Sequence, residues 1–248
     1  MSDNELQGRV AVITGAGRSI GRAMALELAA GGAAIVVNVR SNRAEADAVV
    51  KEIESKGGRA MIAIADVIDA SAVNAMAEAA LKKFGRIDYL INNAALRGEK
   101  AIEHMTYEEW RHIIGVTLDG AFHCVKACLK AIKKSDAGSI INVGGLTGAM
   151  GAPDRVHVVT AKAGVAGFTR GLAMELAPHR ITVNTLVPAM LAKPDKPNEI
   201  PPHPIYRPLL GRAAWPSDIA PLARFLLGPG ARYITGQLVN VNGGTYFH

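Results

Sequence analysis

The sequence predicts an α/β fold, in which a doubly wound, mostly parallel sheet of about seven strands carries helices on both faces. Short apolar segments alternate with helical segments along the whole chain. The strand segments are apolar on both faces, which is typical of parallel strands that are covered on both sides. No repeat or linker divides the 248 residues, and single α/β domains commonly reach this length. We therefore expect a single domain over residues 1–248.

The expected elements follow one another without a break. The segments expected to be strands are Val10–Thr14, Ala34–Val39, Ala60–Ala65, Tyr89–Asn92, Ser139–Val143, Ile181–Leu186 and Leu238–Val241. The segments expected to be helices are Ile20–Ala30, Ala44–Lys56, Ser71–Phe84, Tyr107–Lys134, Val158–Leu176 and Ser217–Leu227. Each strand before the last is followed by a helix, and this order produces parallel crossovers.

One segment departs from this alternation. Seven of the 12 prolines lie between Pro194 and Pro216, after the sixth expected strand. Proline lacks an amide donor and restricts the residue before it, so this stretch cannot form a regular helix. Open α/β sheets bind ligands at the carboxyl edge of their strands, where this segment begins. We expect residues 190–216 to form a lid over a substrate pocket; the alternative is a rigid surface connection.

Composition and charge limit the class of protein. Hydrophobic residues make up 49% and charged residues 20% of the chain, which is a globular balance. No apolar run approaches about 18 residues and the first five residues are polar, so we expect no membrane span, no signal peptide and a cytoplasmic location. The net charge of +6 arises from scattered basic residues, and an anionic small ligand explains it as well as nucleic acid does. We expect no nucleic-acid partner.

The two cysteines of the chain are too few for a disulfide framework. Cys124 and Cys128 are spaced i,i+4 beside His123, and such a group can in principle hold a metal ion. Two cysteines on one apolar helix are more often packing residues. We expect no metal site.

A glycine-rich loop follows the first strand and leads directly into a helix. A strand, a glycine turn and a helix start place several amide groups and the helix dipole around one point, which suits a pyrophosphate. The loop therefore predicts a Rossmann-type nucleotide site. Its expected contact residues are Gly15, Gly17, Arg18, Ser19, Ile20 and Gly21.

The end of the second strand indicates which dinucleotide binds. A site that prefers NAD(H) usually has an acid there for the ribose 2′-hydroxyl, and no acid is present. Arg40 occupies this edge, and Arg18 can approach the same ribose. Two guanidinium groups suit a 2′-phosphate, so we expect NADP(H) to be favoured over NAD(H).

Further motifs give the chain a clear resemblance to the classical short-chain dehydrogenase/reductase family over nearly its whole length. Thr14 to Gly21 resembles the TGxxxGxG motif, with Ser19 in place of the middle glycine, and residues 92–95 resemble the NNAG motif. The resemblance implies cofactor contacts from Asp66, Val67, Asn93, Ala94, Ala95, Lys162 and Pro188.

The family's chemistry couples hydride transfer to proton transfer, and the resemblance implies where its catalytic residues should stand. Lys162 matches the family's lysine. Val158 stands at the tyrosine position, Gly145 at the serine position and Thr117 at the asparagine position. Valine and glycine have no side-chain proton to donate, so we expect the usual mechanism not to operate. Lys162 and Thr117 are the remaining catalytic candidates.

Neighbouring side chains are weaker candidates for the missing proton donor. His157 titrates near neutrality, but one helical residue turns it about 100° from the face of Val158 and Lys162. Arg97, after the fourth strand, is a further residue that can point inward. For both, a position on a loop or a helix surface is the simpler interpretation.

Three functions stay open at this point. The first is an atypical NADP(H)-dependent oxidoreductase without the usual serine and tyrosine, and a substrate that carries its own proton or charge, such as an iminium, would need no tyrosine. The second is a cofactor-binding protein without catalysis, such as a partner subunit or a redox sensor. The third is lyase or isomerase chemistry in the same pocket. The substrate stays unknown.

The two longest expected helices also bear on assembly. They carry apolar residues on more than one face, so one face needs a partner beyond the sheet. The resemblance implies that these helices pair across a two-fold axis. We expect a homotetramer.

Overall fold

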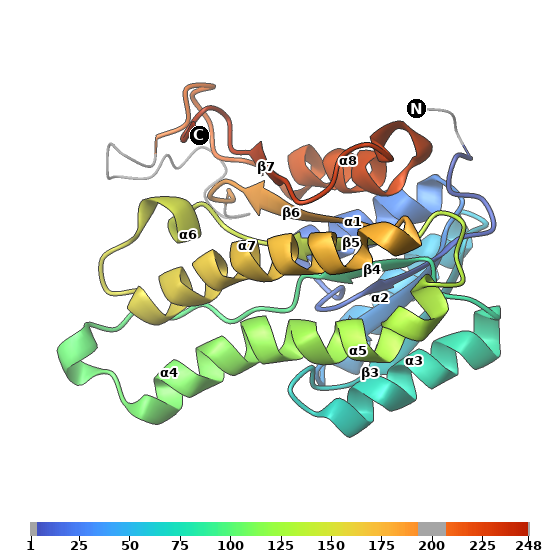
Figure 1. The fold of residues 1–248 in the computed structure, drawn as a ribbon, viewed down its shortest axis with the longest axis horizontal. Coiled ribbons are helices and arrows are strands. Elements are labelled where there is room, and N and C mark those ends of the chain that lie inside the picture. Colours follow the sequence, from blue (N-terminus) through green and yellow to red (C-terminus); the bar gives the residue numbers. More distant parts are fainter. Residues whose placement is uncertain (1–3, 193–206, 248) are drawn as a thin grey trace.

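The computed structural model describes residues 4–192 and 207–247 and forms one seven-stranded sheet (Figure 1). The strand order is β3-β2-β1-β4-β5-β6-β7, and every neighbouring pair is parallel. The order reverses between β1 and β4, and this switch point is where open α/β sheets bind ligands. The expected doubly wound, Rossmann-type fold is confirmed.

The strands are short and strongly apolar. Their bounds are β1 (Val10–Ile13), β2 (Ala34–Val39), β3 (Arg59–Ile64), β4 (Tyr89–Asn92), β5 (Ser139–Val143), β6 (Thr182–Pro188) and β7 (Leu238–Val241). The five inner strands are buried along their whole length, whereas the edge strands β3 and β7 are partly exposed. This burial explains why the inner strands read as continuous apolar runs in place of an alternating pattern.

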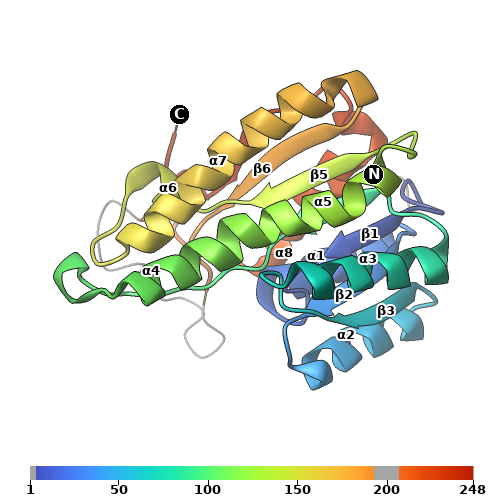
Figure 2. The ribbon, with the colours of Figure 1, turned by 60° about the horizontal axis from the view of Figure 1, so that its bottom comes forward.

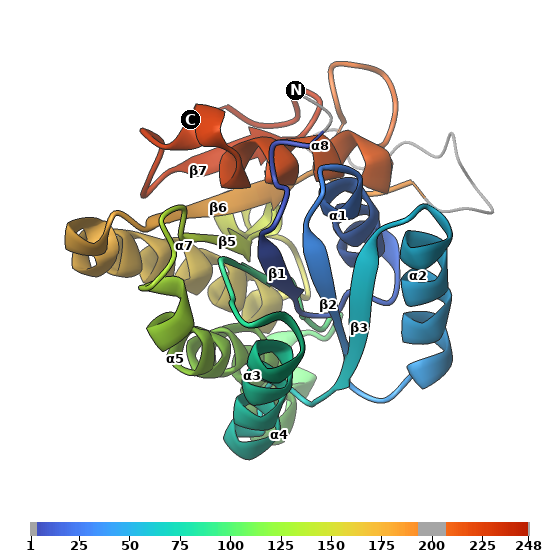
Figure 3. The same cartoon turned by 90° about the vertical axis from the view of Figure 1, so that its right-hand side faces the viewer.

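Helices cover both faces of the sheet (Figure 3). Their bounds are α1 (Ser19–Ala30), α2 (Arg43–Ser55), α3 (Ala70–Phe84), α4 (Tyr107–Ile114), α5 (Gly120–Ile132), α6 (Thr147–Met150), α7 (Val156–Leu176) and α8 (Pro216–Leu227). The helices α1, α2 and α8 cover one face, and α3, α5 and α7 cover the other. Within the described residues, none of these helices has the length and apolar composition needed to cross a bilayer.

The long helix expected over Tyr107–Lys134 is interrupted, so that expectation was wrong in detail. A π-helical turn over Gly115–Asp119 separates α4 from α5, and α5 ends at Ile132. The Gly120 amide donates to the Gly115 carbonyl across this wide turn. A Cβ atom on Gly120 would lie 2.6 Å from Val67 Cγ2, so the helix packs here too closely for any larger residue. Helix α4 continues the line of α5 beyond the sheet (Figure 2).

Most of the expected proline-rich lid, residues 193–206, lies outside the described residues. Its two flanks pair with each other. Leu191 and Ala214 form an isolated parallel bridge, and the Ala192 amide donates to the Ala214 carbonyl at 2.8 Å. Leu191 and Ala214 are therefore neighbours in the fold, a short distance along the chain from the end of β6.

Candidate functional site

The loop between β1 and α1 forms a tight cradle at the switch point of the sheet. Gly15 has a φ of +62°, which a larger residue adopts only with strain. A Cβ atom on Gly21 would lie 2.2 Å from the Gly15 carbonyl oxygen, so α1 must approach the loop through a glycine. Helix α1 begins at Ser19, and the Arg18 side chain does not cap it. Its first amide groups can therefore bind an anion, and the cradle fits the pyrophosphate of a dinucleotide.

Side chains from two neighbouring strands hold this cradle in place. Asn93 Nδ2 donates to the carbonyls of Thr14 and Gly15 at 2.8 and 3.1 Å. The Thr14 hydroxyl accepts the amides of Asn93 and Ala94 at 2.9 and 3.0 Å. These bonds connect the end of β1 to the end of β4, so Asn93 and Ala94 hold the loop after β1 in its conformation. Ala95, the next residue, is exposed.

Asn38, within β2, supports the same loop and was missed by the sequence analysis. Its side-chain amide donates to the carbonyls of Ala63 and Ala65 at 3.2 and 3.0 Å. Its backbone carbonyl accepts the Ala16 amide at 2.8 Å. The available signal was a single polar residue inside an otherwise apolar buried strand, since such a side chain must find partners.

The region beyond the loop carries both signs of charge. Arg18, in the loop, and Arg40, after β2, are both exposed. The structure adds Glu45, whose Oε2 would lie 3.1 Å from a Cβ atom on Gly17. Asn42 caps α2 by accepting the Glu45 amide, and this first turn carries the carboxylate back to the loop. A carboxylate is therefore present beside the loop, although no acidic residue stands at the end of β2.

The remaining expected cofactor residues lie along the same edge. Asp66 follows β3, and its Oδ1 accepts the Ile68 amide at 3.2 Å. Val67 is buried against Gly120, and its carbonyl bonds His123 Nδ1 at 3.1 Å. Pro188 is the last residue of β6 and is buried. These positions lie at or after the carboxyl ends of β3 and β6.

The expected cysteine packing is consistent with the structure. Cys124 and Cys128 are buried in the core on α5, and burial raises the pKa of the Cys128 thiol to about 12. Such thiols stay protonated, whereas metal binding needs the thiolate.

Lys162 lies at the catalytic end of the edge. Its Nζ donates to the Val143 carbonyl, the last residue of β5, at 2.7 Å. Burial and the nearby Arg97 guanidinium lower the pKa of Lys162 from 10.5 to about 8. A Cβ atom on Gly145 would lie 3.6 Å from Lys162 Cγ, so the lysine stem runs past the position where the family resemblance implies a serine. The amine therefore donates to a neutral oxygen, and its pKa of about 8 lies much closer to neutral pH than that of an ordinary lysine.

Val158 and Thr117 fill their positions without an exposed polar group. Val158 is 8% exposed and packs in an apolar cluster with Ile113, Ile114 and Ala161. Thr117 is 5% exposed within the π-helical turn. The structure therefore brings Gly145 and Lys162 together, with Val158 one helical turn before Lys162 on α7, and of these three residues Lys162 alone has a side chain that can transfer a proton.

His157 is not the surface residue that the sequence analysis favoured. It is 3% exposed, and its Nδ1 has no hydrogen-bond partner among the described residues. Its Nε2 would lie 2.9 Å from a Cβ atom on Gly98, so the ring packs against the loop after β4. The side chain is enclosed between this loop and α7.

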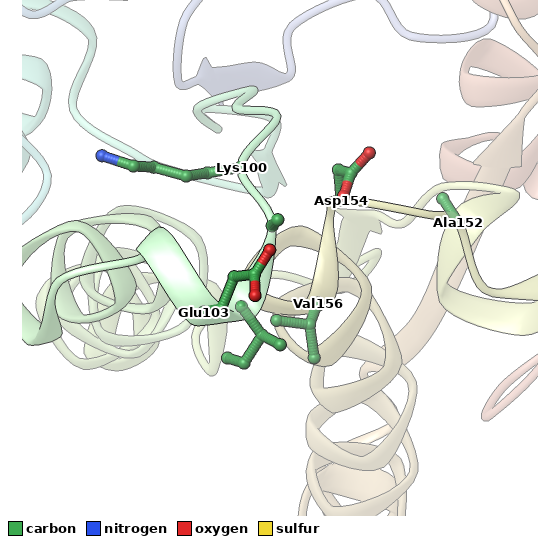
Figure 4. Close-up of a pocket in the computed structure, with 7 residues that line it drawn as sticks. Lys100, Glu103, Ala152, Asp154 and Val156 are labelled. Carbon is green, nitrogen blue, oxygen red and sulfur yellow. The ribbon is translucent and has the colours of Figure 1, made fainter.

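A separate hollow lies outside these residues, between the loop after β4 and the start of α7 (Figure 4). Its volume is about 280 Å³, and Glu103, Asp154 and Val156 border it. The Lys100 side chain points away from the two carboxylates, and its amine donates to Glu109 at 2.8 Å. None of the expected catalytic or cofactor residues lines this hollow.

The fold and this site together define a class, the Rossmann-type nucleotide-binding oxidoreductases. The family model described as enoyl-(acyl carrier protein) reductase matches residues 15–246. A 3-oxoacyl-[acyl-carrier-protein] reductase of Synechocystis sp. is 42% identical over 96% of this chain and 97% of its own length. The corresponding FabG reductase of Staphylococcus aureus is 37% identical over 95% of this chain and 97% of its own.

Two solved structures have the same fold. A dehydrogenase/reductase from Sinorhizobium meliloti 1021 has a TM-score of 0.91 and 32% identity, over 97% of this chain and 96% of its own. A blue fluorescent protein from a metagenomic library, in complex with NADPH, has a TM-score of 0.90 and 31% identity, over 98% and 99%. The chain belongs to the short-chain dehydrogenase/reductase family.

Proposed function

We propose that the protein is an NADP(H)-dependent oxidoreductase that works without the serine and tyrosine of its family. The observation that carries this proposal is that one edge of the sheet combines a well-formed nucleotide cradle with two positions that have no proton donor. The cradle at Gly15 and Gly21 has the close glycine approach and uncapped helix start that a dinucleotide needs. Gly145 and Val158 supply no proton at the catalytic end. NADPH in the metagenomic blue fluorescent protein supports the choice of cofactor.

Each part of the chain then has a defined task. The amides at the start of α1 bind the pyrophosphate, and Arg18 and Arg40 bind the 2′-phosphate. Asp66 and Val67 border the adenine, while Asn93 and Ala94 hold the loop. A bound nicotinamide supplies or accepts the hydride. Lys162 holds the nicotinamide ribose and is the group beside Gly145 and Val158 that can hold or release a proton.

A second candidate function is nucleotide binding without catalysis, either as a partner subunit or as a redox sensor. The packing of Val158 favours it, because the tyrosine position has become part of an apolar cluster. Lyase or isomerase chemistry has no specific support in the site's geometry.

The test combines a titration with a screen. NADPH and NADH are titrated by fluorescence, and the NADPH complex is then offered carbonyl, enoyl and imine compounds while absorbance of the reduced nicotinamide is followed. Oxidation of NADPH by any of these supports the oxidoreductase. Tight binding without oxidation supports the second candidate, and no binding of either nucleotide contradicts both.

We also propose a cytoplasmic homotetramer. Phe122 of α5 and Ile68 border a hollow of about 620 Å³ on the outer face of α4 and α5, and they are 49% and 42% exposed. Met174 on α7 is 82% exposed. Exposed apolar groups of this size on two helices favour burial against further copies of the chain. Light scattering at micromolar concentration tests this, and a monomeric mass contradicts it.

A further inference from the structure

Two cations lie at the catalytic end of the edge without a carboxylate partner. Lys162 bonds only a neutral carbonyl oxygen among the described residues, and the charge that acts on it is the positive one of Arg97. Arg97 is exposed and takes part in no ion pair within residues 4–192 and 207–247. An ammonium group that is partly buried beside a guanidinium is unfavourable unless an anion joins them.

The backbone around Arg97 is fixed, so its position beside α7 is a property of the fold. Leu96 packs against the apolar cluster that contains Val158 and Ala161. Gly98 lies against the ring of His157, within 2.9 Å of Nε2 for a Cβ atom built there. The residues on both sides of Arg97 therefore dock on the first turns of α7. Lys162 is one helical turn beyond Val158 on the same helix.

Two other cations of this region are already paired. Arg155 forms an ion pair with Glu99, and Lys100 forms one with Glu109 at 2.8 Å. These pairs occupy Arg155 and Lys100 with carboxylates of the chain. Among the described residues, Arg97 is the charged group that acts on the Lys162 amine, so no carboxylate offsets the positive charge there.

We propose that the substrate carries a carboxylate next to its reacting carbon, and that Arg97 and Lys162 bind this carboxylate between them. The proposal rests on the function proposed above, which places the nicotinamide beside Lys162. A guanidinium binds a carboxylate with two parallel hydrogen bonds, and the lysine amine has donors left after its bond to Val143. The same two positive charges would repel a cationic iminium, so the site should prefer an anionic substrate.

The test uses butyrate as the probe and butyramide as its neutral counterpart, each titrated by calorimetry into the free protein and into the protein with NADP⁺. Butyrate is expected to bind at least 10-fold more tightly than butyramide in both forms, because the two cations belong to the chain. Arg97→Met is expected to weaken butyrate at least 10-fold and to leave butyramide unchanged. Arg170→Met, an exposed arginine further along α7, is the matched control and is expected to change neither.

A second arm separates the two cations. Butyrate affinity is expected to fall as the pH rises above about 8, where free Lys162 loses its proton, and Lys162→Arg is expected to remove this dependence. Arg97 is the other charged group that acts on the amine among the described residues, and it stays protonated over this range. Equal binding of butyrate and butyramide, or full affinity in Arg97→Met, would overturn the proposal. Failure of NADP⁺ to bind would instead overturn the proposed function, since the titrations of the free protein remain readable.

Discussion

Gly21, in the nucleotide half of the carboxyl edge formed by β1, β2 and β4, is packed more tightly than Gly145, in the catalytic half formed by β5 and α7. In the nucleotide half a Cβ atom on Gly21 would lie 2.2 Å from a backbone oxygen. In the catalytic half a Cβ atom on Gly145 would meet Lys162 at an ordinary distance of 3.6 Å. The Gly21 position therefore excludes a larger residue, whereas the Gly145 position has room for the serine that the family resemblance implies there; the neighbouring Gly144 is again tight, since a Cβ atom there would lie 2.7 Å from Thr185 Cγ2.

Most buried polar side chains are bonded in both halves. The buried side chains of Thr14 and Asn38 are bonded to backbone groups of neighbouring strands. In the catalytic half, Asn142 of β5 donates to the Thr169 hydroxyl of α7 at 2.9 Å. Buried polar groups are normally partnered, because leaving one unpaired costs about 1–3 kcal/mol. Asn92 Oδ1, at the end of β4, and His157 Nδ1, on α7, are buried without a partner among the described residues, so each half contains one such group.

The largest expected effect comes from introducing the serine and tyrosine that the proposed function regards as missing. Gly145→Ser together with Val158→Tyr is expected to raise carbonyl reduction by about 10²–10⁴-fold, the usual contribution of a general acid. NADPH oxidation with simple ketones measures it. Each single change is expected to do little, since the two groups act on one oxygen.

Gly145→Ser with Val158→Phe is the matched control, because it brings the ring without the hydroxyl. A gain of the same size in that control would show that packing, and not a proton donor, limits the reaction. Activity of the unchanged protein near 10 s⁻¹ on simple ketones would show that another residue is the acid.

Gly21→Ala tests the constraint on the nucleotide half. Because the added methyl group would meet the Gly15 carbonyl and Asn93 Nδ2, we expect the free energy of unfolding to fall by about 3 kcal/mol and NADPH binding to be lost. Denaturant unfolding and fluorescence titration measure the two effects. Gly167→Ala is the control, since open space surrounds that position on α7, and it is expected to be neutral or slightly stabilising. If Gly21→Ala and Gly167→Ala lower the free energy of unfolding equally, the close packing at Gly21 is not the cause of the loss.

Features that depend on local sequence patterns could be predicted, whereas features that depend on contacts between distant segments could not. The strand order and the faces of the helices follow from apolar runs and their alternation, and the loop at Gly15 follows from glycine spacing. The π-helical turn does not, because it depends on the close approach of Gly120 to Val67, more than 50 residues away. Glu45 is brought to Gly17 by the first turn of α2, and the burial of His157 depends on Gly98 of another loop. Contacts between distant segments were the part that local patterns could not predict.

Arg40→Ala sharpens the assignment of the 2′-phosphate. We expect it to weaken NADP(H) by about 1.5–3 kcal/mol, the scale of a hydrogen bond to a charged group, and to leave NAD(H) nearly unchanged. Fluorescence titration with both nucleotides measures the difference. Arg43→Ala, an exposed neighbour that pairs with Asp47, is the control and is expected to change neither. Equal losses for both nucleotides in Arg40→Ala would show that this residue does not read the 2′-phosphate.

The smallest expected effect concerns Glu45, whose carboxylate opposes the two arginines beside the loop. A carboxylate near Gly17 repels a 2′-phosphate but can accept a hydrogen bond from a ribose hydroxyl. Glu45→Gln keeps the shape and removes the charge, so we expect NADP(H) to bind more tightly by about 0.2–1 kcal/mol, the range for partly exposed charges, and NAD(H) to bind no better. The gain should shrink as salt is added, because salt screens the repulsion. If Glu45→Gln instead weakens both nucleotides equally, the carboxylate holds a hydroxyl that they share, and the preference for NADP(H) must come from Arg18 and Arg40 alone.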